Sequence, residues 1–143
     1  MSPRRRALVV AAALAVVVAL GAVPTAAGWW RRSKPALARA GEVPVLVVPG
    51  YNGTAASVGT LAARLRAAGR MVVVVDLPDR GTRDLRASAT GLARAVDRTG
   101  AARVDLVGYS AGGVVIRLLL ADPVRALRAR RVVLLGTPNH GTE

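Results

Sequence analysis

Five consecutive residues of this 143-residue chain have the types and the spacing that nucleophilic catalysis requires. The segment Gly108-Tyr109-Ser110-Ala111-Gly112 matches G-x-S-x-G, the pattern of a tight strand-to-helix turn that exposes a serine hydroxyl above a sheet. A serine hydroxyl is a poor nucleophile at neutral pH, so a base and backbone N–H donors must lie beside the reacting carbonyl. The strained turn also needs small residues two positions before and after the serine, and both positions hold glycine. Ser110 is therefore the candidate nucleophile.

The same motif also has a purely structural interpretation. Ser110 could simply cap a helix, with the two glycines serving a close turn between a strand and that helix. A nucleophile turn needs an apolar strand before it and a helix after it. Residues 104–107 form a mostly apolar run and residues 113–121 have helix-like composition, so the surroundings favour the catalytic interpretation.

The elements that position this motif repeat along the chain from Val43 onward. Short apolar runs at 45–48, 71–75, 104–107 and 132–135 alternate with helix-like segments at 57–68, 85–98 and 112–121. Two of these helices are followed by a glycine, at Gly69 and Gly100. Apolar strands separated by helices predict an α/β fold, with a parallel sheet covered by helices on both faces and right-handed crossovers.

Ligands of such sheets bind beyond the carboxyl ends of the strands, where this chain has four glycine-bearing turns. They are residues 49–53, 76–81, 108–112 and 136–142. A dinucleotide site would need G-x-G-x-x-G after the first strand. Asp76 suits the acidic position of that motif, but Gly50-Tyr51-Asn52-Gly53 lacks its glycine spacing. A P-loop ending in Gly-Lys-Ser or Gly-Lys-Thr does not occur either, so nucleotide binding is disfavoured.

The charge of the chain does not predict a nucleic-acid partner. The net charge of +13 comes from 21 basic and 8 acidic residues, and the arginines are spread along the predicted helices. Single-strand binding uses aromatic stacking platforms, whereas this chain has two tryptophans, two tyrosines and no phenylalanine. Solvent-exposed helix faces explain the arginines better than a nucleic-acid-binding surface does. The absence of cysteine excludes disulfides and thiolate metal sites within the chain.

The N-terminus has the pattern of an export signal. Arg4-Arg5-Arg6 precedes an apolar run at 7–23, which is followed by the small residues of 24–28. Trp29-Trp30-Arg31-Arg32 would equally suit an uncleaved anchor, and a hydrophobic helix buried in a soluble domain is the less favoured third alternative. We therefore expect residues 1–28 to be a signal peptide or a hydrophobic signal-anchor helix. Residues 29–42 would be a linker, and residues 43–143 an exported domain.

Four segments together resemble the N-terminal half of an α/β-hydrolase and are most similar to the small bacterial lipases and esterases. They are Val45-Leu46-Val47-Val48-Pro49-Gly50-Tyr51-Asn52-Gly53, Asp76-Leu77-Pro78, Val107-Gly108-Tyr109-Ser110-Ala111-Gly112-Gly113 and Leu135-Gly136-Thr137-Pro138-Asn139-His140-Gly141-Thr142. These segments have the order and spacing of the family and cover essentially everything after the linker. The resemblance implies an α/β-hydrolase-like parallel sheet with helices on both faces, incomplete at about four strands.

The resemblance also implies roles for individual residues. Ser110 would attack an ester carbonyl and form an acyl-enzyme, which water then cleaves. The backbone N–H of Ala111 would supply one oxyanion donor, and the N–H of Tyr51, in the loop after the first strand, would supply the second. Many relatives have a histidine before the glycine of that loop, where this chain has Pro49. No metal or organic cofactor is implied.

The acid and the base of the family are harder to find. They follow the serine in the order acid, then histidine, and the candidates after Ser110 are Asp122, His140 and Glu143. Asp122 lies about twelve residues along a helix, roughly 18 Å from the serine, and better fits a polar helix end. His140 lies in a turn that looks structural, so we expect the catalytic histidine in a later loop. Because the chain ends within that turn, we expect a truncated hydrolase sequence, weakly active or inactive as given.

The sequence thus predicts an exported serine esterase or lipase that acts on small-molecule or lipid esters. It would contact the membrane through its N-terminal segment if that segment is not cleaved, and no obligate protein partner is inferred. The alternative is a non-catalytic α/β-hydrolase-like fragment or a membrane-anchored interaction protein. Amidases, peptidases and acyltransferases of similar fold also stay open, because later loops build most of their pockets.

Overall fold

The computed structural model describes residues 41–141 of the chain. The predicted signal peptide or anchor at 1–28, and nearly all of the predicted linker, lie outside the described residues. Within the described part, no helix is long and apolar enough to cross a membrane.

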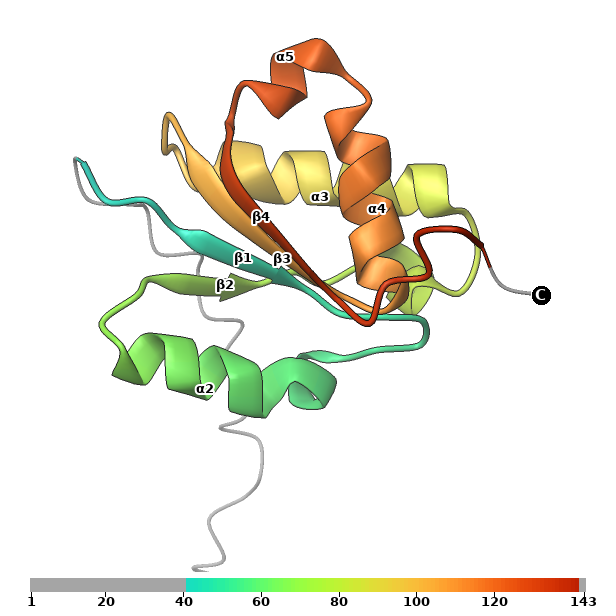
Figure 1. Ribbon diagram of the computed structural model, residues 1–143, viewed down its shortest axis with the longest axis horizontal. Coiled ribbons are helices and arrows are strands. Elements are labelled where there is room, and N and C mark those ends of the chain that lie inside the picture. Colours follow the sequence, from blue (N-terminus) through green and yellow to red (C-terminus); the bar gives the residue numbers. More distant parts are fainter. Residues whose placement is uncertain (1–40, 142–143) are drawn as a thin grey trace, which may run out of the picture. The chain divides into compact units, whose positions relative to one another are not determined.

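Strands and helices alternate along the described chain, as the hydrophobic pattern predicts (Figure 1). In chain order they are β1 (Val45–Val48), η2 (Ala55–Val58), α2 (Gly59–Ala67), β2 (Val72–Val74), η3 (Pro78–Gly81), α3 (Leu85–Arg98), β3 (Val104–Tyr109), α4 (Ala111–Leu120), α5 (Pro123–Ala126) and β4 (Ala129–Leu135).

The four strands form one parallel sheet in the order β2-β1-β3-β4. Leu46 pairs with Val73 on one side and with Leu106 on the other, and Leu106 in turn pairs with Val132. Because all strands run the same way, the turns that follow them lie at one edge of the sheet, which we call the carboxyl edge. The expected α/β fold with a parallel sheet is confirmed.

The two faces of the sheet bury different helices, because successive side chains of a strand point to opposite faces. On one face, Leu46 and Leu106 belong to a core cluster with Leu92 of α3 and Ile116 of α4. On the other face, Val47 and Val107 pack with Val58 of η2, and Leu61 and Leu65 of α2 extend this smaller cluster. Figure 1 shows the same division, with α3 and α4 on one side of the sheet and α2 on the other.

The predicted bounds hold for β1 and α3 and shift elsewhere. The bounds of α3 can be read from the sequence because both ends carry a local signal. The side chain of Asp84 accepts a hydrogen bond from the N–H of Arg86 at the start, and Gly100, with φ of 66°, follows the end.

The short helix α5 is not predicted from the sequence. It forms because Asp122 caps it and Pro123 occupies its first turn, so Asp122 has the structural role of a helix end.

The last strand differs most from the expectation. β4 begins at Ala129, three residues before the predicted start, and its first part contains Arg130 and Arg131. The register between β3 and β4 shifts at this point. Val132, Val133 and Leu135 are 41%, 47% and 38% exposed, so β4 is much less covered by the described residues than β1 and β3.

Candidate active site

Ser110 lies at the sharp turn between β3 and α4. β3 continues through Tyr109, α4 begins at Ala111, and the serine between them has φ of 52° and ψ of −126°. A non-glycine residue with such angles is strained, and strain of this kind is found where the surrounding structure enforces it. The N–H of Ser110 donates to the carbonyl oxygen of Leu135 at 2.8 Å, so the neighbouring strand holds the turn. The predicted strand-turn-helix context is confirmed.

The glycines around Ser110 are required by close packing of backbone against backbone. A Cβ on Gly108 would lie 2.6 Å from the Cα of Gly113, and a Cβ on Gly112 would overlap the carbonyl oxygens of Val48 and Pro49. Neither obstacle is a flexible side chain, so the helix could not start in this position with larger residues. The small-residue requirement read from the motif therefore has a direct structural cause.

The loop after β1 reaches the serine. A Cβ on Gly50 would be 3.0 Å from the Cβ of Ser110 and 3.5 Å from its Oγ, so the backbone of this loop lies beside the hydroxyl. The N–H of Gly53 donates to the carbonyl of Gly50 at 3.0 Å, and Asn52, with φ of 53°, occupies the turn between them. The loop thus forms a closed turn next to Ser110.

Two backbone donors at this place are available for an acceptor. Among the backbone hydrogen bonds of the described loops and turns, the N–H groups of Tyr51 and Ala111 donate to no carbonyl. Ala111 is the first residue of α4, where helix geometry leaves the N–H without an intrahelical partner. The side chains of Tyr51 and Tyr109 are 68% and 48% exposed, so both flanking aromatic residues face solvent.

A second strained turn follows β2 at the same edge. Asp79 and Arg80 both have positive φ, at 49° and 55°. Leu77 is buried before the turn, and Gly81 is buried after it, with a Cβ on Gly81 lying 3.9 Å from the carbonyl oxygen of Gly50. This turn therefore packs against the loop that borders Ser110.

The turn after β4 lies along α4. The N–H of Asn139 donates to the carbonyl of Thr137 at 2.8 Å, and the guanidinium of Arg117 donates to the carbonyl of Asn139 at 2.9 Å. Thr137 contacts the start of α4 at Gly113, a contact that sequence reasoning missed because its two residues are far apart in the chain. His140 is exposed in this turn, and no hydrogen bond ties its imidazole to an acid among residues 41–141.

A cluster of charged side chains lies at the opposite edge of the sheet. Asp105, at the start of β3, is 6% exposed and accepts hydrogen bonds from Arg70 and Arg130. The hydrogen bonds from Arg130, followed by those of Arg70, hold the pKa of the Asp105 carboxyl below its usual value, against the opposing effect of burial. In the same pair, Asp105 raises the pKa of Arg130. Within the described part of the chain, no group of three or more His, Cys, Asp or Glu could hold a metal ion.

Comparison with known proteins agrees with this geometry. The profile of the alpha/beta hydrolase family matches residues 45–142, well over half of the chain, including every strand and every turn described above. The chain belongs to the α/β-hydrolase family. No curated protein sequence gives a match.

Solved structures of this family superpose on the chain. The mature form of the Bacillus licheniformis lipase BlEst2 is 25% identical, with a TM-score of 0.63 over 74% of this chain. An extracellular α/β-hydrolase from a Paenibacillus species is 20% identical, with a TM-score of 0.58 over 66% of this chain, and that similarity concerns the fold alone. The chain spans 45% of the length of the first of these structures and 40% of the second.

Proposed function

We propose that this α/β-hydrolase chain carries the nucleophile and the oxyanion donors of a serine hydrolase that cleaves carboxylic esters. The single observation that carries the proposal is Ser110. It is the residue with strained backbone angles at the start of α4, and glycines on either side let the turn pack directly against neighbouring backbone.

The proposed reaction proceeds through an acyl-enzyme. The Oγ of Ser110 attacks the ester carbonyl carbon, and a base accepts the hydroxyl proton as the Oγ–C bond forms. The tetrahedral intermediate then expels the alcohol, which receives that proton. Water, activated by the same base, attacks the acyl-enzyme, releases the carboxylic acid and restores the serine hydroxyl.

The negative charge of the intermediate would be stabilised by the N–H groups of Ala111 and Tyr51. The positions of the two residues support this role. Ala111 directly follows Ser110, and Tyr51 directly follows Gly50, whose backbone lies beside the serine hydroxyl. Neither N–H has a carbonyl partner in the described turns, so each can donate to the oxyanion without first breaking a hydrogen bond.

The base and its acid partner are the remaining requirement. Among the described residues, Asp122 is used as a helix cap, and His140 is exposed and makes no hydrogen bond to an acid. The chain spans less than half of the Bacillus licheniformis lipase. We therefore propose that sequence beyond Glu143 supplies the histidine and the acid.

Export of the protein is also part of the proposal. The basic, apolar and small-residue order of the first 28 residues supports it. A fusion of residues 1–42 to a reporter that is active only outside the cytoplasm would test this directly.

The function is tested by hydrolysis of 4-nitrophenyl butyrate. The reading frame should be expressed to its natural stop codon, beside the chain as given and a Ser110→Ala variant of the longer protein. We expect the longer protein to hydrolyse the ester and Ser110→Ala to lose at least about a thousandfold in kcat/KM. Activity that survives Ser110→Ala would overturn the proposed mechanism.

A further inference from the structure

We propose that Thr137 is a positioning residue for Ser110, acting through the Cα of Gly113. The inference rests on the proposed function and adds to it a residue outside the G-x-S-x-G motif. The first observation is steric. A Cβ on Gly113 would lie 2.7 Å from Cγ2 and 2.8 Å from Cβ of Thr137, and it would overlap Oγ1. The threonine side chain therefore fills the space that any larger residue at position 113 would need.

The position of Gly113 makes this contact relevant to the nucleophile. Gly113 is the third residue of α4, and its N–H donates to the carbonyl of Ser110 at 3.0 Å. Gly108 of β3 also packs against the Cα of Gly113. Thr137 and Gly108 thus both pack against the Cα of Gly113. This atom belongs to the first turn of α4, which directly follows Ser110 and begins with Ala111. Movement of this turn would displace the hydroxyl and the oxyanion donor together.

Thr137 is itself held in place by two independent connections. Gly136, with φ of 58°, reverses the chain after β4, whose last residue Leu135 accepts the N–H of Ser110. On the other side, Asn139 is bonded to the carbonyl of Thr137 and to the guanidinium of Arg117. Arg117 lies four residues after Gly113, so both contacts fall on the same side of α4.

The hydroxyl of Thr137 is buried and has no hydrogen-bond partner among the described residues. A buried hydroxyl without a partner is destabilising, so its hydrogen-bonding ability does not explain the residue. The volume and branched shape of the side chain do explain it, because both branches contact the position of a Gly113 side chain. Valine has the same shape without the hydroxyl, which separates the two contributions experimentally.

The experiment measures how fast Ser110 reacts with an alkyl fluorophosphonate in the protein expressed to its natural stop codon. In that reaction the Oγ–P bond forms, the P–F bond breaks, and fluoride and the hydroxyl proton leave. We expect Thr137→Ala to slow the labelling of Ser110 about tenfold at a temperature where the protein is fully folded. For ester hydrolysis, kcat should fall with little change in KM. Thr137→Val should restore most of the labelling rate.

A matched control separates positioning from general destabilisation. Thr99 is 1% exposed, and its hydroxyl donates to Val96 and accepts from Ala101, at the opposite edge of the sheet. Thr99→Ala should lower Tm while leaving the labelling rate unchanged. Thr137→Ala labelling at the wild-type rate would overturn the positioning role even if its Tm fell.

A paired substitution tests the contact itself. Gly113→Ala should lose labelling because the added methyl group overlaps Thr137, and Thr137→Gly in the same protein should recover part of it. Absence of any recovery would contradict the proposal. If the wild-type protein shows no labelling that Ser110→Ala removes, the proposed function fails and the positioning role fails with it. Wild-type labelling with no difference among the variants overturns the positioning role alone.

Discussion

The two edges of the sheet are stabilised by different means. At the carboxyl edge lie all four non-glycine residues of the described chain that have positive φ: Asn52 after β1, Asp79 and Arg80 after β2, and Ser110 after β3. At the amino edge lie four ion pairs, which join Arg70 and Arg130 to Asp105 and join Arg125 and Arg128 to Asp97. The residues with strained backbone angles therefore lie after the strands, and the ion pairs lie near the starts of the strands.

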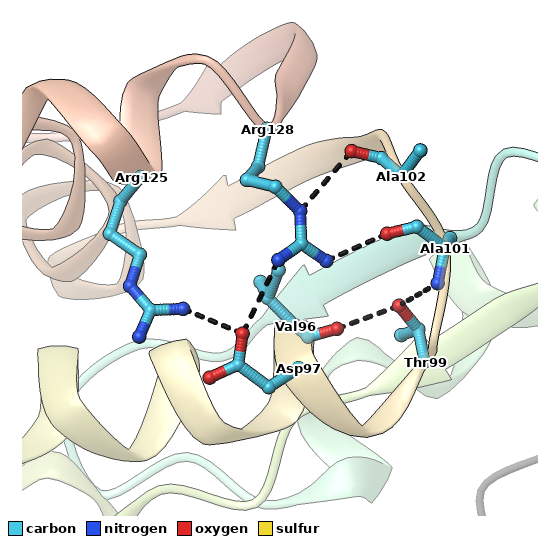
Figure 2. A network of polar contacts seen from close by, with 7 residues as sticks. All are labelled: Val96, Asp97, Thr99, Ala101, Ala102, Arg125 and Arg128. Carbon is cyan, nitrogen blue, oxygen red and sulfur yellow. Dashed lines mark hydrogen bonds and ion pairs between the residues drawn. The ribbon is translucent and has the colours of Figure 1, made fainter.

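The amino edge is held by side chains that cross between elements. Asp105 of β3 joins Arg70, which precedes β2, to Arg130 of β4. Figure 2 shows the second cluster, in which Arg125 and Arg128 converge on Asp97 of α3, and Arg128 also donates to the carbonyls of Ala101 and Ala102. These contacts fix the elements that precede β3 and β4.

The carboxyl edge is held by backbone packing through glycine. The first turn of α4 contacts the loop after β1 at Gly112, β3 at Gly108 and the turn after β4 through Gly113. Close contacts of this kind position atoms accurately but leave no room for relaxation. We infer that the amino edge supplies the stability that maintains the strained backbone angles of the carboxyl edge. Each substitution below tests one side of that division.

The largest effect is expected at Gly112. In Gly112→Ala the new methyl group overlaps the backbone carbonyls of Val48 and Pro49, so α4 must move away from the loop beside Ser110. We expect a loss of about 3 kcal/mol in the free energy of unfolding and loss of ester hydrolysis. Urea denaturation and the 4-nitrophenyl butyrate assay measure both.

Gly59 provides the matched control. A Cβ on Gly59 meets nothing within 4 Å, at the first residue of α2. Gly59→Ala should be neutral or raise the free energy of unfolding by up to about 1 kcal/mol, because alanine favours helix. If both glycine variants behaved alike, the packing account of the carboxyl edge would be wrong.

The next effect is expected at Asp105. Asp105→Ala leaves two arginines without their carboxylate, and since their side chains are 34% and 32% exposed, water compensates part of the loss. We expect a decrease of about 2 to 3 kcal/mol in the free energy of unfolding. The rate of fluorophosphonate labelling below Tm should stay unchanged. A large change in labelling with little change in stability would contradict the separation of the two edges.

The same residue predicts a pH dependence. The pKa of Asp105 is lower in the folded protein, chiefly through its hydrogen bonds to Arg130, so the unfolded chain binds a proton more readily. The stabilisation is therefore complete above the unfolded pKa and is lost as pH falls through the folded pKa. Thermal unfolding between neutral pH and about pH 3 should show a steeper fall in Tm for the wild type than for Asp105→Asn. Parallel curves would show that Asp105 does not contribute.

The smallest effect is expected at Asp97. Its side chain is 47% exposed, so the ion pairs with Arg125 and Arg128 are screened by solvent. Asp97→Ala should reduce the free energy of unfolding by no more than about 1 kcal/mol and leave labelling unchanged. A loss as large as that of Asp105→Ala would mean that burial does not decide which ion pairs matter at this edge.

The sequence predicts the elements whose signals are local. β1 is a continuous apolar run, and α3 has a capping aspartate at its start and a glycine after its end, so their bounds are readable. The turn at Ser110 is likewise readable, because its glycines lie within the motif. These features need no knowledge of distant contacts.

Features that depend on distant partners could not be predicted. The predicted strand at 132–135 leaves out Arg130 and Arg131, yet both belong to β4, and Asp105 of the neighbouring strand binds Arg130. Gly113 has no local reason to be glycine, and the reason is Thr137, which lies in the turn after β4. Asp105 is unexpected in a buried strand for the same reason: its partners come from two other segments.

The most direct test of the central claim is to locate the covalent adduct formed with an alkyl fluorophosphonate. Protein expressed to the natural stop codon is labelled, its intact mass is measured, and the modified residue is mapped by peptide mass spectrometry. We expect a single adduct on Ser110 that is absent in Ser110→Ala. An adduct on another residue, or no adduct in a folded protein that hydrolyses esters, would contradict it.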